Sequence, residues 1–91
     1  MAHNKDKVLI ATRKAKSLMD KVLKMIESDQ YCIHVIQQNL AIIGLLRSAN
    51  LSLLDGHLNN CVKTAIQEKN TGRLNEMMEE LMKVMKVAQT K

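Results

Sequence analysis

The 91-residue chain lacks proline, tryptophan and phenylalanine and has a single tyrosine, whereas leucine, isoleucine, valine, methionine and lysine are common. The absence of helix-breaking proline, the scarcity of aromatic residues and the abundance of good helix formers predict an all-α fold. No apolar run reaches about 18 residues, so no membrane-spanning helix is predicted. The length predicts a single domain over residues 1–91.

Recognisable enzyme motifs are also missing. The sequence has no phosphate-binding glycine loop, no Ser/His/Asp signature and no pair of acid–base residues in a known pocket motif, so we do not expect an enzyme. The first residues, MAHNKDKVLI, lack the apolar core of a secretory signal. With only two cysteines, we expect reduced thiols and a cytoplasmic protein.

Acidic residues are scarce at the start of the chain. Residues 1–24 carry seven Lys and Arg against two Asp, and residues 25–91 are balanced, so the net charge of +5 resides in the first segment. A solvated helix face is one interpretation, and a polyanion partner, DNA or RNA before membrane, is the other. On a helix these basic residues share a sector about 120° wide: Lys7, Arg13, Lys14, Lys21 and Lys24.

The spacing of apolar residues predicts three helices, over about 5–27, 29–68 and 72–89. In the first helix apolar residues recur at alternating intervals of three and four, and they form one stripe: Val8, Ala11, Ala15, Leu18, Val22 and Met25. Four methionines of the third helix are predicted to fill gaps in the core rather than to bind a metal through their thioethers: Met77, Met78, Met82 and Met85.

Polar residues between these segments predict where the helices begin. Ser28 or Asp29 is the expected N-cap of the central helix. Asn70 or Thr71 is the expected N-cap of the last helix, and Gly72 is expected in the turn before it.

The predicted central helix is too long to be covered by two shorter helices of the same chain. Its uncovered apolar surface would exceed what soluble monomers tolerate, which predicts an obligate oligomer with a two-fold dimer as its first unit. Two such helices running antiparallel would cross near residue 45, where the small residues Ala41 and Gly44 favour close approach.

His57 and Cys61 lie four residues apart, a spacing that stacks two soft ligands on one face of a helix. Cys32 lies 25 residues before His57, about 37 Å along the same predicted helix, so an intact helix cannot bring it back. An antiparallel second copy can, and in projection the three side chains point within about 40° of one another. Two thiolates and an imidazole suit Cu(I), whereas Zn(II) would need a fourth ligand. His3 is a candidate extra ligand, and buried apolar cysteines are the alternative interpretation.

The segments YCIHVIQQNLAIIGLL and LLDGHLNNCVKTAI resemble the CsoR/RcnR family of small bacterial metal-responsive repressors. The family pattern is a Cys, a His 25 residues on, and a Cys or His four further, which Cys32, His57 and Cys61 match. The resemblance implies three-helix protomers with one long central helix, in antiparallel dimers that assemble into a dimer of dimers, a homotetramer. It also implies Cu(I) bound between subunits by these three residues, with Tyr31 and Glu76 lying behind them.

Other branches of the family differ at these positions. The nickel/cobalt branch is similar but has His at the position of Cys61 and uses a histidine near the N-terminus, which His3 could mimic; the persulfide-sensing branch lacks the central His. The family's basic pair in the first helix is similar to Arg13 and Lys14. A family Arg in the second helix corresponds to Ile43 here, with Arg47 one turn later.

Together, the residues and the resemblance predict a Cu(I)-sensing transcriptional repressor that binds operator DNA in the apo form and releases it on metal binding. The residues predicted to contact DNA are Arg13, Lys14, Lys21, Lys24 and Arg47. The alternatives are a nickel/cobalt or thiol/persulfide sensor of the same family, or a copper-binding helical module without DNA binding.

Overall fold

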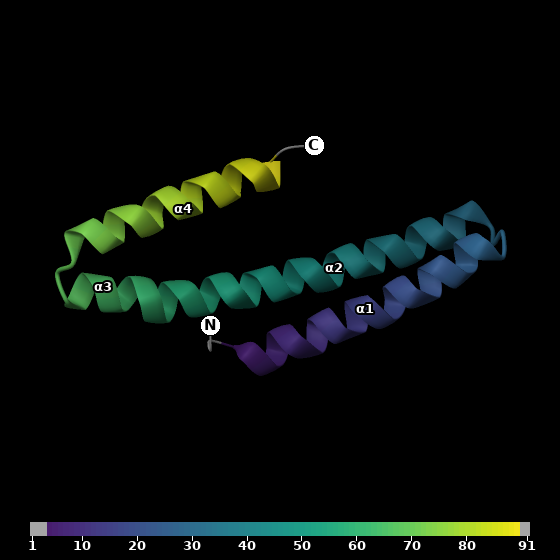
Figure 1. The fold of residues 1–91 in the computed structure, drawn as a ribbon, viewed down its shortest axis with the longest axis horizontal. Helices are drawn as coiled ribbons and strands as arrows, with labels where there is room; N and C mark the ends of the chain where they lie inside the picture. The colour runs from purple at the N-terminus through teal and green to yellow at the C-terminus, as the bar shows by residue number, and fades with distance from the viewer. Residues whose placement is uncertain (1–3, 90–91) are drawn as a thin grey trace. The chain divides into compact units, whose positions relative to one another are not determined.

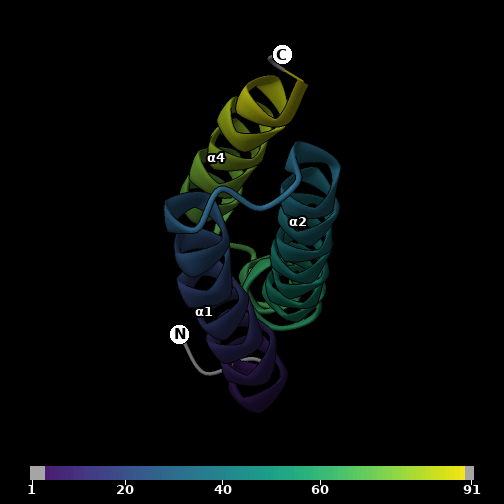
Figure 2. The same ribbon diagram turned by 90° about the vertical axis from the view of Figure 1, so that its right-hand side faces the viewer.

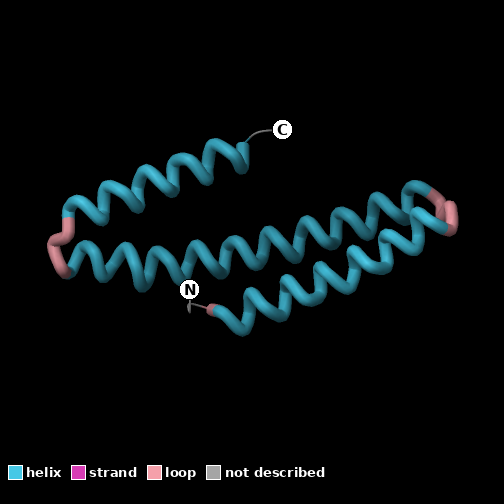
Figure 3. The backbone as a smooth tube through the Cα atoms, viewed as in Figure 1, coloured by secondary structure: helices cyan, strands magenta, loops and turns pink. Residues whose placement is uncertain are grey.

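The computed structural model describes residues 4–89, which are helical apart from short connecting segments (Figures 1 and 3). No strand occurs in this described range, and the all-α prediction is confirmed. The elements follow in the order α1 (Lys5–Glu27), α2 (Cys32–Gly56), the π-helix η1 (His57–Val62), α3 (Lys63–Gln67) and α4 (Thr71–Gln89).

The chain divides into two compact units, the first ending at Asp55 and the second beginning at Gly56. The boundary therefore lies where α2 passes into η1. Within residues 4–89, no helix is both long enough and apolar enough to cross a bilayer.

The first unit is a hairpin in which α1 and α2 lie side by side and antiparallel (Figures 1 and 2). Its buried centre consists of Ala15 and Val22 of α1 and Ile42 of α2. Near the N-terminus, Asn4 Nδ2 donates a 2.9 Å hydrogen bond to the Ser52 carbonyl and ties the start of α1 to α2. The predicted stripe of α1 is confirmed, because all six of its residues are buried or half-buried.

The connection between α1 and α2 differs from the sequence prediction. Ser28 and Asp29 end α1 instead of capping α2. Asp29 adopts a left-handed backbone with φ 55°, and Gln30 N–H bonds to Met25 O at 2.9 Å while Asp29 N–H bonds to Ile26 O at 3.1 Å. This pair of hydrogen bonds is a Schellman motif, which satisfies the last carbonyls of α1. The N-cap prediction was wrong because the residues that favour N-caps can also end a helix.

The predicted central helix over 29–68 is also corrected. It begins at Cys32, and its α-helical pattern gives way to a π-helix at His57 before α-helix resumes at Lys63. The Lys63 N–H bonds to Leu58 O, five residues back, which is the hydrogen-bond pattern that defines a π-helix. The projection of the central helix as one ideal α-helix therefore fails beyond Gly56.

The second unit continues from η1 through α3 to α4, with Ala65 and Met77 buried. Asn70 is the N-cap of α4, as predicted, because its Oδ1 accepts the Arg73 N–H at 3.1 Å. Gly72 lies inside α4 rather than in the preceding turn.

The methionines of α4 are only partly in the core of the chain. Met77 is 4% exposed, whereas the three others are each at least half exposed. The prediction that all four pack in the core is therefore correct within the protomer for Met77 alone. The exposed members are Met78, Met82 and Met85.

Candidate metal site and basic surface

Cys32 is the first residue of α2, and its side chain is exposed. The carbonyl of the preceding residue, Tyr31, accepts the N–H groups of His34 at 2.9 Å and Val35 at 3.4 Å, and so caps the helix. The exposed Tyr31 ring meets the His34 ring edge-on, with centroids 5.5 Å apart. The Cys32 thiol thus stands at an accessible helix start, directly after an aromatic side chain.

His57 and Cys61 both lie in η1 and are half-buried. The π-helical hydrogen-bond pattern covers the whole segment between them, so their relative placement depends on this unusual turn. Within the turn, Asn60 Nδ2 donates a 2.8 Å hydrogen bond to the Gly56 carbonyl. One short element therefore carries an imidazole and a thiol, and the Asn60–Gly56 hydrogen bond lies within the same turn.

Cys32 belongs to the first compact unit, whereas His57 and Cys61 belong to the second. Among the described residues of the protomer, no three His, Cys, Asp or Glu side chains gather into a group that could hold a metal. Neither cysteine is in a disulfide, so both thiols keep the chemistry of a soft ligand. The site shared between two protomers stays a prediction, and its donor set of two thiols and one imidazole fits Cu(I).

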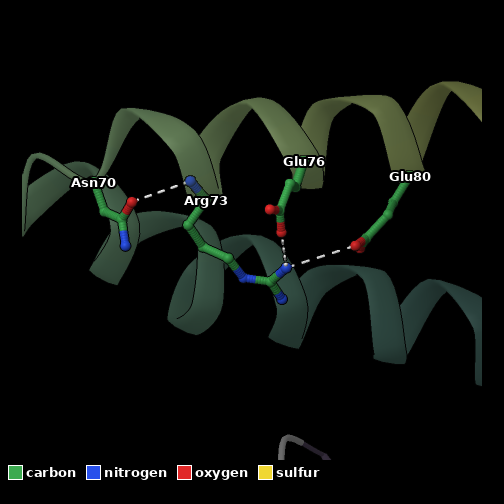
Figure 4. A network of polar contacts seen from close by, with 4 residues as sticks. All are labelled: Asn70, Arg73, Glu76 and Glu80. Atoms are coloured by element: carbon green, nitrogen blue, oxygen red, sulfur yellow. Dashed lines mark hydrogen bonds and ion pairs between the residues drawn. The ribbon is translucent and has the colours of Figure 1, made fainter.

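Glu76 lies in the first turns of α4 within a small polar network (Figure 4). Arg73 pairs with Glu76 at 3.1 Å and with Glu80 at 3.6 Å, and all three side chains are largely exposed. Exposed pairs of this kind add little to stability. The implied role of Glu76 behind the metal ligands stays a prediction, as does that of Tyr31, while His3 lies outside the described residues.

The residues predicted to contact DNA are all exposed. Two shallow grooves of about 290 and 440 Å³ run between α1 and α2, and both are lined by Lys14 and Leu45. Lys7, Ser48 and Ser52 line the first groove, and Arg13 lines the second. Cationic and hydroxyl side chains therefore border two open grooves that also have apolar walls.

Arg47 stands apart from this basic side. The face of α2 packed on α1 carries Ile42, Leu45 and Ala49, and in helical projection Arg47 lies roughly opposite it. The structure thus groups the four basic residues of α1 on one helix and places the fifth on another face of the hairpin.

Three residues that line the groove or hold the π turn were not identified from the sequence. Ser48 and Ser52, four residues apart on α2, share a helix face, but serines within an apolar segment carry no specific signal. Asn60 was also overlooked, although an asparagine in a helix interior is unfavourable and its side chain commonly bonds to the backbone.

Comparison with known proteins shows which family the chain belongs to. A family model described as metal-sensitive transcriptional repressor matches residues 4–87. The copper-sensing transcriptional repressor RicR of Mycobacterium tuberculosis is 37% identical over 75 residues, which are 82% of this chain and 78% of RicR. The copper-sensing transcriptional repressor CsoR of Mycobacterium ulcerans is 33% identical over 72 residues, which are 79% of this chain and 59% of that protein.

The fold has a solved counterpart. The crystal structure of the copper-sensing repressor CsoR with Cu(I) from Geobacillus thermodenitrificans superposes with a TM-score of 0.84 at 30% sequence identity, covering 99% of this chain and 91% of that one. The fold and the family match define an all-helical metal-responsive regulator. The chain belongs to the family of metal-sensitive transcriptional repressors, which confirms the resemblance to CsoR/RcnR and supports a regulator rather than an enzyme.

Proposed function

We propose that the protein is a Cu(I)-responsive transcriptional repressor whose metal site combines Cys32 of one protomer with His57 and Cys61 of another. The observation that carries the proposal is η1, in which one helical turn holds an imidazole and a thiol, while a second thiol stands exposed at the start of α2. Similarity to repressors named copper-sensing, one of them solved with Cu(I), supports copper as the effector.

The donor set suits this ion. Thiolates are soft ligands that select Cu(I), and three donors satisfy it, whereas Zn(II) usually takes four ligands. When bound, Cu(I) would link the first turn of α2 in one protomer to η1 of its partner. The nickel/cobalt alternative is less favoured, because that chemistry prefers imidazole and oxygen donors over two thiolates.

A second copy of the chain is needed to complete the site, and α2 offers a surface for it. On α2, the side roughly opposite α1 carries large apolar residues that are exposed: Ile33, Ile36, Leu40, Ile43, Leu51 and Leu54. We name this set the outer face of α2. Arg47 lies on the same side in helical projection, so this face holds one cation among its apolar residues. Soluble monomers rarely leave so many large apolar side chains in water. An antiparallel copy would cover it and bring Cys32 near the partner's η1.

The basic side of α1 is the proposed DNA contact. Seven Lys and Arg lie within residues 1–24 against two Asp, and four such chains in a dimer of dimers would present the same charge four times. Contacts between Lys or Arg and phosphates release condensed counterions, so the affinity is expected to fall steeply with salt. The apo form binds operator DNA through this surface.

Metal and DNA sites are coupled through the hairpin. Cys32 begins α2, and α2 packs against α1 through Ile42 on Ala15 and Val22. A displacement of the start of α2 on metal binding is therefore transmitted to α1, the helix that carries the basic residues. If the linked arrangement fits DNA poorly, a coupling free energy of about 3 kcal/mol weakens DNA binding by roughly 150-fold.

The test is a titration of labelled operator DNA, selected from genomic fragments by the apo protein. The apo protein is expected to bind with a strong salt dependence, and one equivalent of Cu(I) per protomer is expected to release the DNA. His57→Ala is expected to bind DNA and to resist release, whereas Gln37→Ala, a control at an exposed residue of α2, is expected to behave as the wild type. Metal binding without any DNA binding at low salt would contradict the repressor function, and release by Ni(II) but not by Cu(I) would contradict copper as the effector.

A further inference from the structure

The π-helical turn that carries His57 and Cys61 is held by a side chain with no established role. The geometry points to Asn60 as a positioning residue: its amide keeps η1 in the π form, and the π form sets the relative placement of the two ligands. This inference rests on the proposed Cu(I) function and goes beyond it, because it assigns a specific residue to the control of metal affinity.

The hydrogen bonds of the turn carry the argument. In an α-helix the Gly56 carbonyl would accept the backbone N–H of Asn60, four residues on. Here that carbonyl also accepts the side-chain Nδ2 of Asn60, at 2.8 Å. One turn later the hydrogen bond from Lys63 N–H reaches back five residues to Leu58 O. The side chain of Asn60 therefore supplies a donor at the carbonyl of Gly56, the residue that directly precedes the π segment.

Sequence propensity agrees with this assignment, although it applies equally to the neighbouring Asn59. Asparagine is a poor residue for a helix interior, and its amide competes with the backbone for carbonyls one turn back, which bends helices. Single π turns are uncommon and concentrate at functional sites. In this chain the π pattern covers His57–Val62. The segment begins at one proposed ligand, His57, and ends one residue after the other, Cys61.

A change from π to α in this segment would move Cys61 relative to His57. An α-helix has fewer residues per turn and rotates each later residue relative to the first, so the angle and the separation between the thiol and the imidazole would change, and with them the fit of the pair to one metal. Residues that orient metal ligands without binding the metal typically change metal affinity by 10- to 100-fold when replaced. We expect an effect of that size when the Asn60 amide is removed.

The experiment compares the full-length wild-type protein with Asn60→Ala, which removes the donor and favours an α-helix, and with Asn60→Asp, which keeps the shape but cannot donate. Asn50→Ala, at an exposed asparagine in the regular part of α2, is the matched control. Cu(I) affinity is measured by competition with a chromogenic Cu(I) chelator. Backbone ¹³C shifts and amide hydrogen exchange of residues 57–63 in the apo protein report the π or α pattern independently of metal.

Both Asn60 variants are expected to lose about 10- to 100-fold in Cu(I) affinity, to show altered apo shifts in η1, and to keep the wild-type oligomeric state. Asn50→Ala is expected to match the wild type. Wild-type affinity in both Asn60 variants, or unchanged apo spectra, would overturn the inference. If the wild-type protein itself fails to bind Cu(I), the proposed function falls together with the metal role of Asn60, while the apo spectra still decide whether Asn60 holds the turn.

Discussion

Replacing Leu40 by glutamate is expected to break the proposed dimer, because Leu40 lies near the middle of the outer face of α2 and is 61% exposed in the protomer. Full burial of a leucine side chain contributes about 1.5–3 kcal/mol, so covering the exposed part is worth roughly 1–2 kcal/mol. A two-fold interface uses the residue twice, which doubles the loss to about 2–4 kcal/mol. At 1.4 kcal/mol for each factor of ten, the dimer dissociation constant rises about 30- to 700-fold, before any cost of burying the new charge.

Sedimentation equilibrium over a range of protein concentrations measures this constant for Leu40→Glu and for a matched control. Leu23→Glu makes the same chemical change at a leucine of α1 that is 58% exposed and lies outside the outer face of α2. The control is expected to retain the wild-type dimer. Equal dissociation constants for both variants would refute the assignment of the outer face of α2 as the dimer interface.

Two further changes test the surface and the fold. Lys14→Ala removes a cation that lines both grooves. The slope of log DNA affinity against log salt concentration is therefore expected to become shallower by about 0.9 for each phosphate that the variant no longer neutralises. Fluorescence anisotropy at several salt concentrations measures this slope, and an unchanged slope would mean that Lys14 does not bind a DNA phosphate. Asp29→Gly relieves a left-handed backbone at φ 55°. The free energy of unfolding, measured in urea, is expected to rise by about 0.5–1 kcal/mol. A decrease would mean that the Asp29 side chain contributes to the turn.

Much of the fold could be predicted from the sequence because it rests on local periodicity. Ala15 and Val22 are buried where the three- and four-residue spacing of α1 places them, and α1 begins and ends at the predicted residues. Asn70 was recognisable as a cap even though α3 ends beside it: its N–H bonds to Ala65 O at 3.0 Å, while its side chain caps α4. These features depend on a few neighbouring residues, which the sequence displays directly.

The errors arose where one local signal permits two structures. Ser28 suits an N-cap, yet its Oγ donates to a carbonyl one turn back at 2.8 Å, and it serves the end of α1 instead. The π turn has no periodic signature, because it depends on which carbonyl each N–H selects. The spacing of apolar residues predicts that Met78 is a core residue. Whether Met78 is buried, however, depends on how many helices cover α4.

The ligands themselves could be proposed from spacing and from the family resemblance, whereas their arrangement could not. Cys32 lies in one compact unit and His57 and Cys61 in the other, so the completed site depends on a partner that no single chain displays. The role of Asn60 became visible only through its hydrogen bond to Gly56, since asparagine is common in helices for many other reasons.

The most direct test of the site between protomers is subunit mixing. Cys32→Ser and His57→Ala each remove one ligand from every site of a homodimer, so neither protein alone is expected to bind Cu(I) tightly. In a dimer of one subunit of each kind, the intact Cys32 of one chain meets the intact His57 and Cys61 of the other, and one of the two symmetric sites is restored. A purified mixed dimer is therefore predicted to bind about one tight Cu(I) per dimer. No tight binding by the mixed dimer would contradict a site shared between protomers.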